Sequence, residues 1–323
     1  MTLIYGWENL RQYEREQKLI RRAVWPRVLP ARNTPITLPT AVPTTVRYPK
    51  ERERHTAHPL PVFLSLWRFR DLIWQMSKRE VISRYRGSTL GLLWSFFHPL
   101  FMLTIYTFVF SVVFQARWGK EIHNQAEFAL ILFAGLIVYS LFAECVNRAP
   151  GLVLGNANYV KKVVFPLEIL PWIAMGSALF HAAVSIGVLL LFQLALYFSL
   201  PWTVLTLPLV LFPLILFTVG ISWFLASCGV FLRDVGQTVG LLTTALLFLS
   251  PVLYPFSALP ESFRHYLLLN PLTFIIEQAR DVLLWGKMPH WAGLGLYSLC
   301  SLLVAWLGLV WFQKTRKGFA DVL

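Results

Sequence analysis

The sequence predicts an all-α membrane protein with six transmembrane helices. Apolar residues make up 56% of the chain and charged residues only 14%, whereas roughly a quarter of the residues of a soluble domain are charged. The run from Ile169 to Leu232 contains no Asp, Glu, Lys or Arg and is too long for a single span. Residues 1–91 carry most of the net charge of +13. These three observations are typical of a chain that crosses a bilayer several times.

Residues 1–65 are expected to form a cytoplasmic extension that ends in a proline-rich linker. Prolines recur from Pro26 to Pro61 and disfavour both helix and strand. The first thirty residues are charged throughout and lack an apolar core, so we expect no cleavable signal peptide. A basic end can also bind nucleic acid. The positive-inside rule explains the basic charge of this N-terminal region more simply, and no nucleic-acid partner is expected.

The next segment predicts an interface helix over residues 66–86 and a first span over residues 92–114. Leu66, Phe69, Ile73 and Met76 recur at helical spacing on one side of a basic stretch. Gly87 favours a break in the helix, and no charged residue follows until Arg117. We therefore expect a helix on the membrane surface that turns at Gly87 and enters the bilayer.

The remaining apolar runs predict spans over residues 128–148, 169–195, 206–231, 236–256 and 290–313. Within the second span, Glu144 and Arg148 are four residues apart, which favours a structural ion pair. Leu200-Pro201-Trp202 predicts a tight hairpin between the third and fourth spans.

Residues 257–287 hold too many charges for a span, and Asn270-Pro271 divides them into two short halves. They predict two short helices that dip back into the membrane surface before the last span. Six spans, with basic segments at both ends of the chain and over residues 149–166, predict that both termini are cytoplasmic.

Several kinds of chemistry are not indicated by the sequence. No GxxxxGK[ST] motif occurs, so the chain is not expected to hydrolyse ATP. No HExxH, GxSxG or paired-Cys metal motif is present, and the three cysteines are expected to be free thiols. His181 is isolated within a span, where a helix–helix hydrogen bond is the common role. We expect no catalytic site, no metal and no cofactor in this chain.

Three blocks of sequence carry a resemblance to a known family. They are residues 78–111, which include the run Ser83-Arg84-Tyr85-Arg86-Gly87-Ser88, then residues 156–171 and residues 231–235. Over about residues 66–323 the chain resembles ABC-2 type permeases that export polysaccharides, most of all the O-antigen branch. Capsular polysaccharide and teichoic acid exporters share the architecture and remain alternatives. A polytopic membrane glycosyl- or acyltransferase is a further alternative, but it would need acid and base residues at the membrane surface.

The resemblance implies a permease subunit in the bacterial inner membrane. Its partners would be a second permease copy in a homodimer and two nucleotide-binding ATPase subunits, which bind ATP and Mg. Its substrate would be a glycan linked to undecaprenyl diphosphate, exported from the cytoplasm. Membrane lipids would surround the spans. The resemblance also implies that the two short helices of residues 257–287 form a re-entrant pair at the periplasmic face.

Three groups of residues are candidates for the steps of such an export. Arg84, Tyr85 and Arg86 lie where the surface helix meets the first span, and they would bind the lipid diphosphate. Lipid headgroup binding and topology are the alternative roles of these arginines. Aromatic residues would line a channel for sugar rings, although ordinary packing is the alternative. They are Trp94, Phe97, Phe101, Phe108, Phe248 and Tyr254.

The third group is the cytoplasmic loop that would dock into the ATPase. Its side chains are too apolar to be left in water, which favours a coupling helix over a loop that only fixes topology. The candidate residues are Asn158, Tyr159, Val160, Lys161, Lys162 and Val163.

Overall fold

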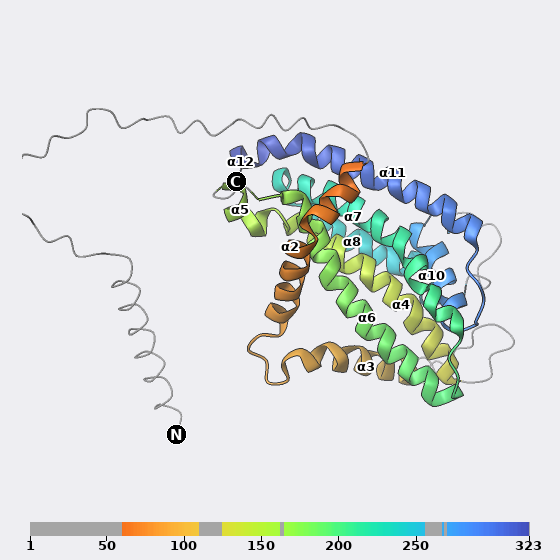
Figure 1. Ribbon diagram of the computed structural model, residues 1–323. Helices are drawn as coiled ribbons and strands as arrows, with labels where there is room; N and C mark the ends of the chain where they lie inside the picture. Colours follow the sequence, from red (N-terminus) through yellow and green to blue (C-terminus); the bar gives the residue numbers. More distant parts are fainter. Residues whose placement is uncertain (1–59, 110–124, 162–164, 256–266, 268–269, 323) are drawn as a thin grey trace, which may run out of the picture. The chain divides into compact units, whose positions relative to one another are not determined.

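The computed structural model describes residues 60–109, 125–161, 165–255, 267 and 270–322. All of them belong to one compact unit, His55–Leu323. Every regular element in these ranges is a helix, and five helices are long and apolar enough to cross a membrane (Figure 1). They are Gly91–Val109, Ala126–Gly151, Leu167–Tyr197, Trp202–Phe231 and Trp291–Val322. The expected all-α multi-pass protein is confirmed in this coarser form, and the sixth span stays a prediction.

The first helix of the described residues, α2 (Leu60–Tyr85), packs along α6 (Leu170–Tyr197). Phe69, Ile73 and Met76 share the expected apolar face, and this face packs against the protein core. The chain then leaves the helix at Gly87, whose φ of +86° lies in the left-handed region that glycine adopts without strain. The predicted break at this residue is confirmed.

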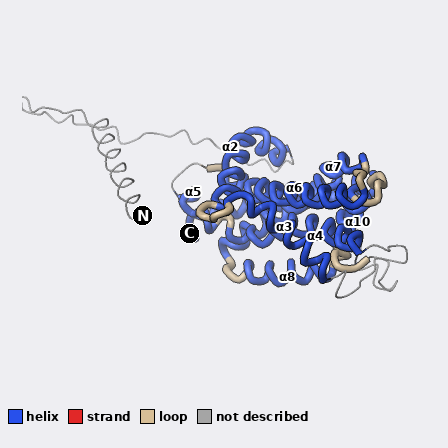
Figure 2. The backbone as a smooth tube through the Cα atoms, turned by 90° about the horizontal axis from the view of Figure 1, so that it is seen from below, coloured by secondary structure: helices blue, strands red, loops and turns tan. Residues whose placement is uncertain are grey.

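Three helices lie side by side next to that turn (Figure 2). The short helix η1 (Gly91–Leu93) leads into α3 (Trp94–Tyr106), which contacts α4 (Gln125–Arg148) and α6. Residues 110–114 of the predicted first span lie outside the described residues. Helices α4 and α6 match their predicted spans within a few residues because charged or proline-containing segments bound both apolar runs.

Helices α7 (Leu207–Phe231) and α11 (Trp291–Thr315) form a closely packed pair. The turn before α7 is the short helix η6 (Trp202–Thr206), where the sequence predicted a hairpin. A Cβ built on Gly220 would lie only 2.7 Å from the Cα of Ala305, and a Cβ on Gly308 would collide with the carbonyl of Gly220. Small residues thus allow the two backbones to touch, as in other membrane helix pairs.

Gly308→Ala is therefore expected to destabilise the protein, because backbone atoms of α7 cannot move aside as a flexible side chain can. We expect a loss of about 1–3 kcal/mol in the free energy of unfolding. Gly295→Ala on the same helix is the matched control, because a Cβ there has no atom within 4 Å. Thermal unfolding in detergent compares the two variants. Equal unfolding temperatures would contradict the close α7–α11 contact.

Helix α8 (Val235–Leu249) is shorter than the sequence predicted. The expected span over 236–256 is wrong beyond Leu249, because Pro251 disfavours helical geometry at Ser250, which adopts an extended conformation with φ −103° and ψ 151°. With 15 residues the helix is about 22 Å long, less than the roughly 30 Å hydrocarbon core of a bilayer. Tyr254, expected on this span, lies in the turn that follows.

Helix α10 (Pro271–Leu283) forms the second half of the predicted re-entrant segment. Asn270 caps it by accepting a hydrogen bond from the backbone N–H of Leu272, and Pro271 occupies the first turn. The break expected at Asn270-Pro271 is confirmed. The first half of the segment is mostly outside the described residues, so the helix pair remains a prediction.

Arg280 anchors α10 to its surroundings although it is completely buried. Its guanidinium donates to the carbonyls of Ile131, Pro251 and Val252 at 2.7–3.0 Å and pairs with Glu277 at 2.8 Å. Burial lowers the pKa of Arg280 to about 10, while the Glu277 carboxylate opposes the shift, so the side chain stays charged at neutral pH. One side chain thus joins α10 to α4 and to the turn after α8.

Candidate functional site

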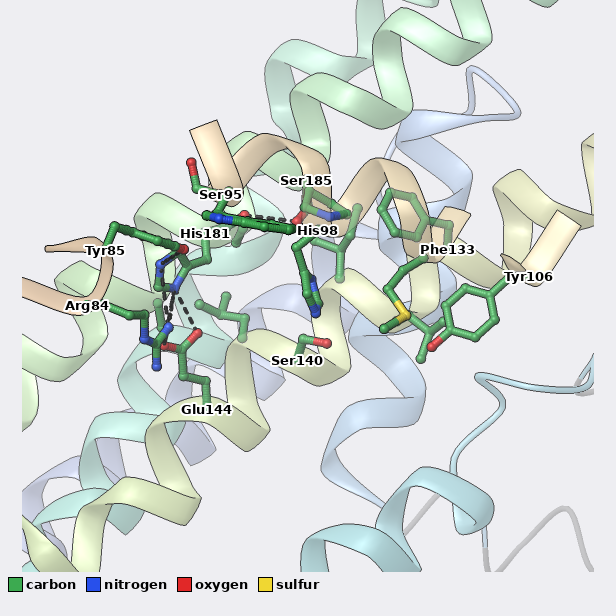
Figure 3. A pocket seen from close by; sticks show the side chains of 18 residues that line it. Arg84, Tyr85, Ser95, His98, Tyr106, Phe133, Ser140, Glu144, His181 and Ser185 are labelled. Atoms are coloured by element: carbon green, nitrogen blue, oxygen red, sulfur yellow. Dashed lines mark hydrogen bonds and ion pairs between the residues drawn. The ribbon is translucent and has the colours of Figure 1, made fainter. Parts of the chain in front are cut away.

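A cavity of about 480 Å³ lies where the end of α2 meets α3, α4 and α6 (Figure 3). Arg84 and Tyr85 form its α2 wall, because the helix ends just before the turn at Gly87. Glu144 enters from α4 and His181 from α6. Four helices from three regions that are distant in the sequence therefore contribute to one site.

These four side chains form a hydrogen-bonded cluster. Arg84 Nη1 donates to Glu144 Oε1 at 2.7 Å and lies 3.0 Å from His181 Nδ1. Nδ1 of His181 is 3.1 Å from Glu144 Oε2, and Nε2 is 3.1 Å from the Tyr85 hydroxyl. With Nδ1 protonated, the imidazole donates to Glu144 and accepts from Tyr85. Burial raises the pKa of Tyr85 above its usual value, so this hydroxyl keeps its proton at neutral pH.

The cluster continues into a chain of alternating charges. Arg148 pairs with Glu80 on α2 and lies 3.8 Å from Glu144, four residues earlier on α4. The ion pair expected between Glu144 and Arg148 is therefore present, but it is the longest contact of the network. Two arginines and two glutamates give no net formal charge. The cluster therefore ties α2 to α4 and α6 without presenting an unbalanced cation to the cavity.

The rest of the cavity changes from polar to apolar along its length. Figure 3 shows His98 and Ser140 between the charged cluster at one end and Tyr106 and Phe133 at the other. His98 comes from α3, and Ser140 from α4. A cavity of this kind can hold an amphipathic molecule, with its polar group at the Arg84 end and its apolar part against the aromatic rings.

The structure separates the three residues expected to bind a diphosphate. Arg84 and Tyr85 line the cavity, and Arg84 is paired with Glu144. Arg86 lies after the end of α2, is exposed, and forms no ion pair with a described residue. A diphosphate at this junction would therefore meet Arg86, which has no ion-pair partner among the described residues. It would also meet Arg84, whose ion pair with Glu144 would have to break.

The aromatic residues expected to line a channel do not form one wall in the single chain. Trp94 borders the cavity beside Arg84 and also a separate apolar groove of about 500 Å³, which is lined by Phe97 and Phe101 on α3. Phe108 and Phe248 are more than half exposed. Tyr254 instead donates a hydrogen bond to the Phe248 carbonyl at 2.9 Å.

The expected coupling segment is only partly described. Asn158 and Tyr159 lie in α5 (Ala157–Lys161), with Asn158 exposed and Tyr159 stacked on Phe165, the ring centroids 4.5 Å apart. Residues 162–164, and thus Lys162 and Val163, lie outside the described residues, as do the side chains of Val160 and Lys161. The C-terminal helix α12 (Phe319–Val322) contacts α5. Tyr159 therefore has one face covered by its own chain.

Sequence reasoning missed the role of His181 in joining the helices around this cavity to Arg84. It identified the Glu144–Arg148 spacing and expected a helix–helix hydrogen bond for His181, which the structure confirms. No sequence pattern indicates contact between Glu144 and His181, which are 37 positions apart on separate helices. Among the described residues, no group of three or more His, Cys, Asp or Glu side chains could hold a metal ion.

Comparison with known proteins gives a consistent result. The sequence profile of the family described as "ABC-2 type transporter" matches residues 71–284. The O-antigen export system permease proteins RfbA of Myxococcus xanthus and Klebsiella pneumoniae are each 29% identical to the chain. The first covers 79% of this chain and 96% of its own length, the second 78% and 95%. The polysialic acid transport protein KpsM of Escherichia coli is 26% identical over 74% of this chain and 92% of its own length. With a family match over more than half of its length, this chain belongs to the ABC-2 type transporter family and is the membrane permease of an ABC exporter.

Proposed function

We propose that the chain exports an O-antigen polysaccharide linked to undecaprenyl diphosphate across the bacterial inner membrane. The observation that carries this proposal is its likeness, over nearly their whole length, to permeases named for O-antigen export. The polysialic acid transport protein KpsM is less similar, at 26% identity. Capsular polysaccharide is therefore the second candidate substrate.

The cavity beside Arg84 suits the lipid end of such a substrate. A diphosphate carries more negative charge than the Glu144 carboxylate and can take both hydrogen bonds of an arginine fork. We infer that the diphosphate binds between Arg86 and Arg84 and displaces Glu144, with Tyr85 nearby to donate. The apolar wall formed by α3 and α4 then receives the first part of the prenyl chain.

A second copy of the chain would complete the path for the sugar. Phe97 and Phe101 on α3 are exposed, as is Phe108 just beyond the end of that helix. Flat aromatic rings pack against sugar faces without holding them firmly. Two copies facing each other would bring these rings to both sides of a channel. Phe248 on α8 would extend the lining, and Tyr254 would lie at its end.

Energy would come from two ATPase subunits that bind ATP and Mg. The helix α5 would dock into them through Asn158 and the segment from Val160 to Val163, with both termini on the same cytoplasmic side. Trp67 and Trp74 are exposed on α2 and would anchor α2 at the membrane surface, where tryptophan is enriched.

Deleting the gene in its native host tests the proposal. We expect O-antigen to disappear from the cell surface while glycan linked to undecaprenyl diphosphate accumulates inside, because synthesis continues and transport stops. Gel analysis of lipopolysaccharide and of extracted lipid-linked glycan measures both effects. An Arg86→Gln variant should restore export only partly, since it loses the one arginine of this junction that has no ion-pair partner among the described residues.

The same deletion strain distinguishes between O-antigen and capsular polysaccharide as the exported substrate. Loss of a capsule with normal O-antigen would replace the proposed substrate with a capsular polysaccharide. Normal amounts of both polysaccharides at the surface would contradict an export function for either.

A further inference from the structure

A second cavity, of about 360 Å³, lies at the start of α4 and the end of α6. Glu127 borders it on α4, and Gln193 and Tyr197 border it on α6. Glu127 precedes Glu144 by 17 positions, which places the cavity about 25 Å along α4 from the Arg84 cluster. The two cavities thus lie near opposite ends of the same pair of helices.

Gln193 is the unusual residue of this second cavity. Its side chain is only 4% exposed, and its Oε1 accepts no hydrogen bond within the part of the chain that the structure describes. Leaving a buried amide oxygen without a donor lowers stability, so such groups are rare unless something else supplies the donor. A ligand hydroxyl in the cavity would satisfy this oxygen.

The other walls define what kind of ligand fits. The Glu127 carboxylate forms no ion pair with any described residue and can accept further hydrogen bonds. Trp285 and Tyr197 offer ring surface. Lys287 Nζ lies 5.6 Å from the centroid of the Trp285 ring and 4.0 Å from Asp281 Oδ1. Acceptors beside aromatic rings match the hydroxyls and C–H faces of a sugar. A carboxylate disfavours an anion, and an acyl chain would leave these acceptors without donors.

We propose that this cavity is a pyranose-binding subsite, with Gln193 and Glu127 accepting from sugar hydroxyls and Trp285 packing against the ring. The inference rests on the proposed export of a glycan. It adds a position at which a sugar unit is held, at the opposite end of the α4–α6 pair from the lipid diphosphate. A bound sugar here would oppose backward sliding of the glycan between ATPase cycles.

Protection of an engineered cysteine tests the subsite. Ser199 borders the cavity and is exposed, so Ser199→Cys can be labelled with maleimide after Cys145, Cys228 and Cys300 are replaced by alanine. The full chain with its ATPase is reconstituted in nanodiscs, and the probes are the methyl α-glycosides of mannose, glucose, galactose and rhamnose. We expect at least one glycoside to slow labelling at position 199. Labelling of Met288→Cys, which is exposed but outside the cavity lining, should not change.

Gln193→Leu then separates binding from folding. The change keeps the size of the side chain and removes the unpartnered amide, so the unfolding temperature should stay equal or rise. Protection by the glycoside should weaken about tenfold, the effect of one lost hydrogen bond. Gln237→Leu, at an exposed glutamine of α8 outside this cavity, should change neither measurement.

Three results would overturn the subsite. They are no protection by any of the four glycosides, equal protection at positions 199 and 288, and unchanged protection in Gln193→Leu. Each could occur in a protein that still exports O-antigen in its native host. Failure of the subsite is therefore distinguishable from failure of the proposed function.

Discussion

Arg280→Met is expected to prevent the protein from folding stably. The change leaves three buried carbonyls without their donor and leaves Glu277, two-thirds buried, without its partner cation. Removing one partner of a buried charged network costs about 3–5 kcal/mol, a large part of the stability of a domain. We expect little monodisperse protein in detergent and a strongly lowered unfolding temperature.

Two variants check that the network is the cause. Lys287→Met removes a cation whose side chain is 70% exposed and makes a long contact of 4.0 Å with Asp281. This change should alter the free energy of unfolding by less than about 1 kcal/mol. Gly135→Ala should reproduce part of the Arg280 defect, because its Cβ would lie 2.7 Å from Arg280 Nη2. Normal stability of Arg280→Met would show that the buried arginine does not hold α10 in place.

Glu144→Leu is expected to lower both stability and export. Arg84 and His181 lose their common acceptor, and we expect a loss of about 2–4 kcal/mol in the free energy of unfolding. Glu144→Gln keeps one acceptor oxygen and should be less damaging. Thermal unfolding and surface O-antigen measure the two consequences in parallel.

The double variant Arg84→Met/Glu144→Leu distinguishes a structural from a functional role of the pair. Replacing both charges with apolar groups should restore much of the stability that Glu144→Leu loses. Export should remain low, because the diphosphate has lost Arg84. If export recovers together with stability, Arg84 serves only to hold α2 against α4.

The long helices could be predicted from sequence because charges and prolines bound their apolar runs, as the limits of α6 and α7 illustrate. The end of α8 was missed, since Ser250-Pro251 lies within a stretch that stays apolar in composition. In the sequence, Arg280 is only one of the charges that interrupt residues 257–287. Its burial depends on Gly135, more than a hundred residues earlier, and on a turn that the sequence had placed inside a span.

The candidate site, too, could be predicted from the sequence only in part. Arg84 and Tyr85 were identified because they adjoin a glycine break at the start of an apolar run. Their partner His181 lies in the middle of another span and has no charged neighbour in the sequence. Pairing between helices depends on how the helices pack against each other, and one sequence carries no direct record of that packing.

The limited length of α8 has a consequence for the backbone carbonyls at its end. A helix that stops short of the hydrocarbon thickness normally makes the bilayer thin or draws water inward to hydrate its last carbonyls. Here the protein supplies the donors itself: Asn270 Nδ2 donates to the Leu249 carbonyl at 3.1 Å, and Arg280 serves the carbonyls of Pro251 and Val252. The carbonyls at the end of α8 and in the turn after it are thus hydrogen-bonded by side chains of the following segment, so the chain can break its helix here without water to hydrate these groups.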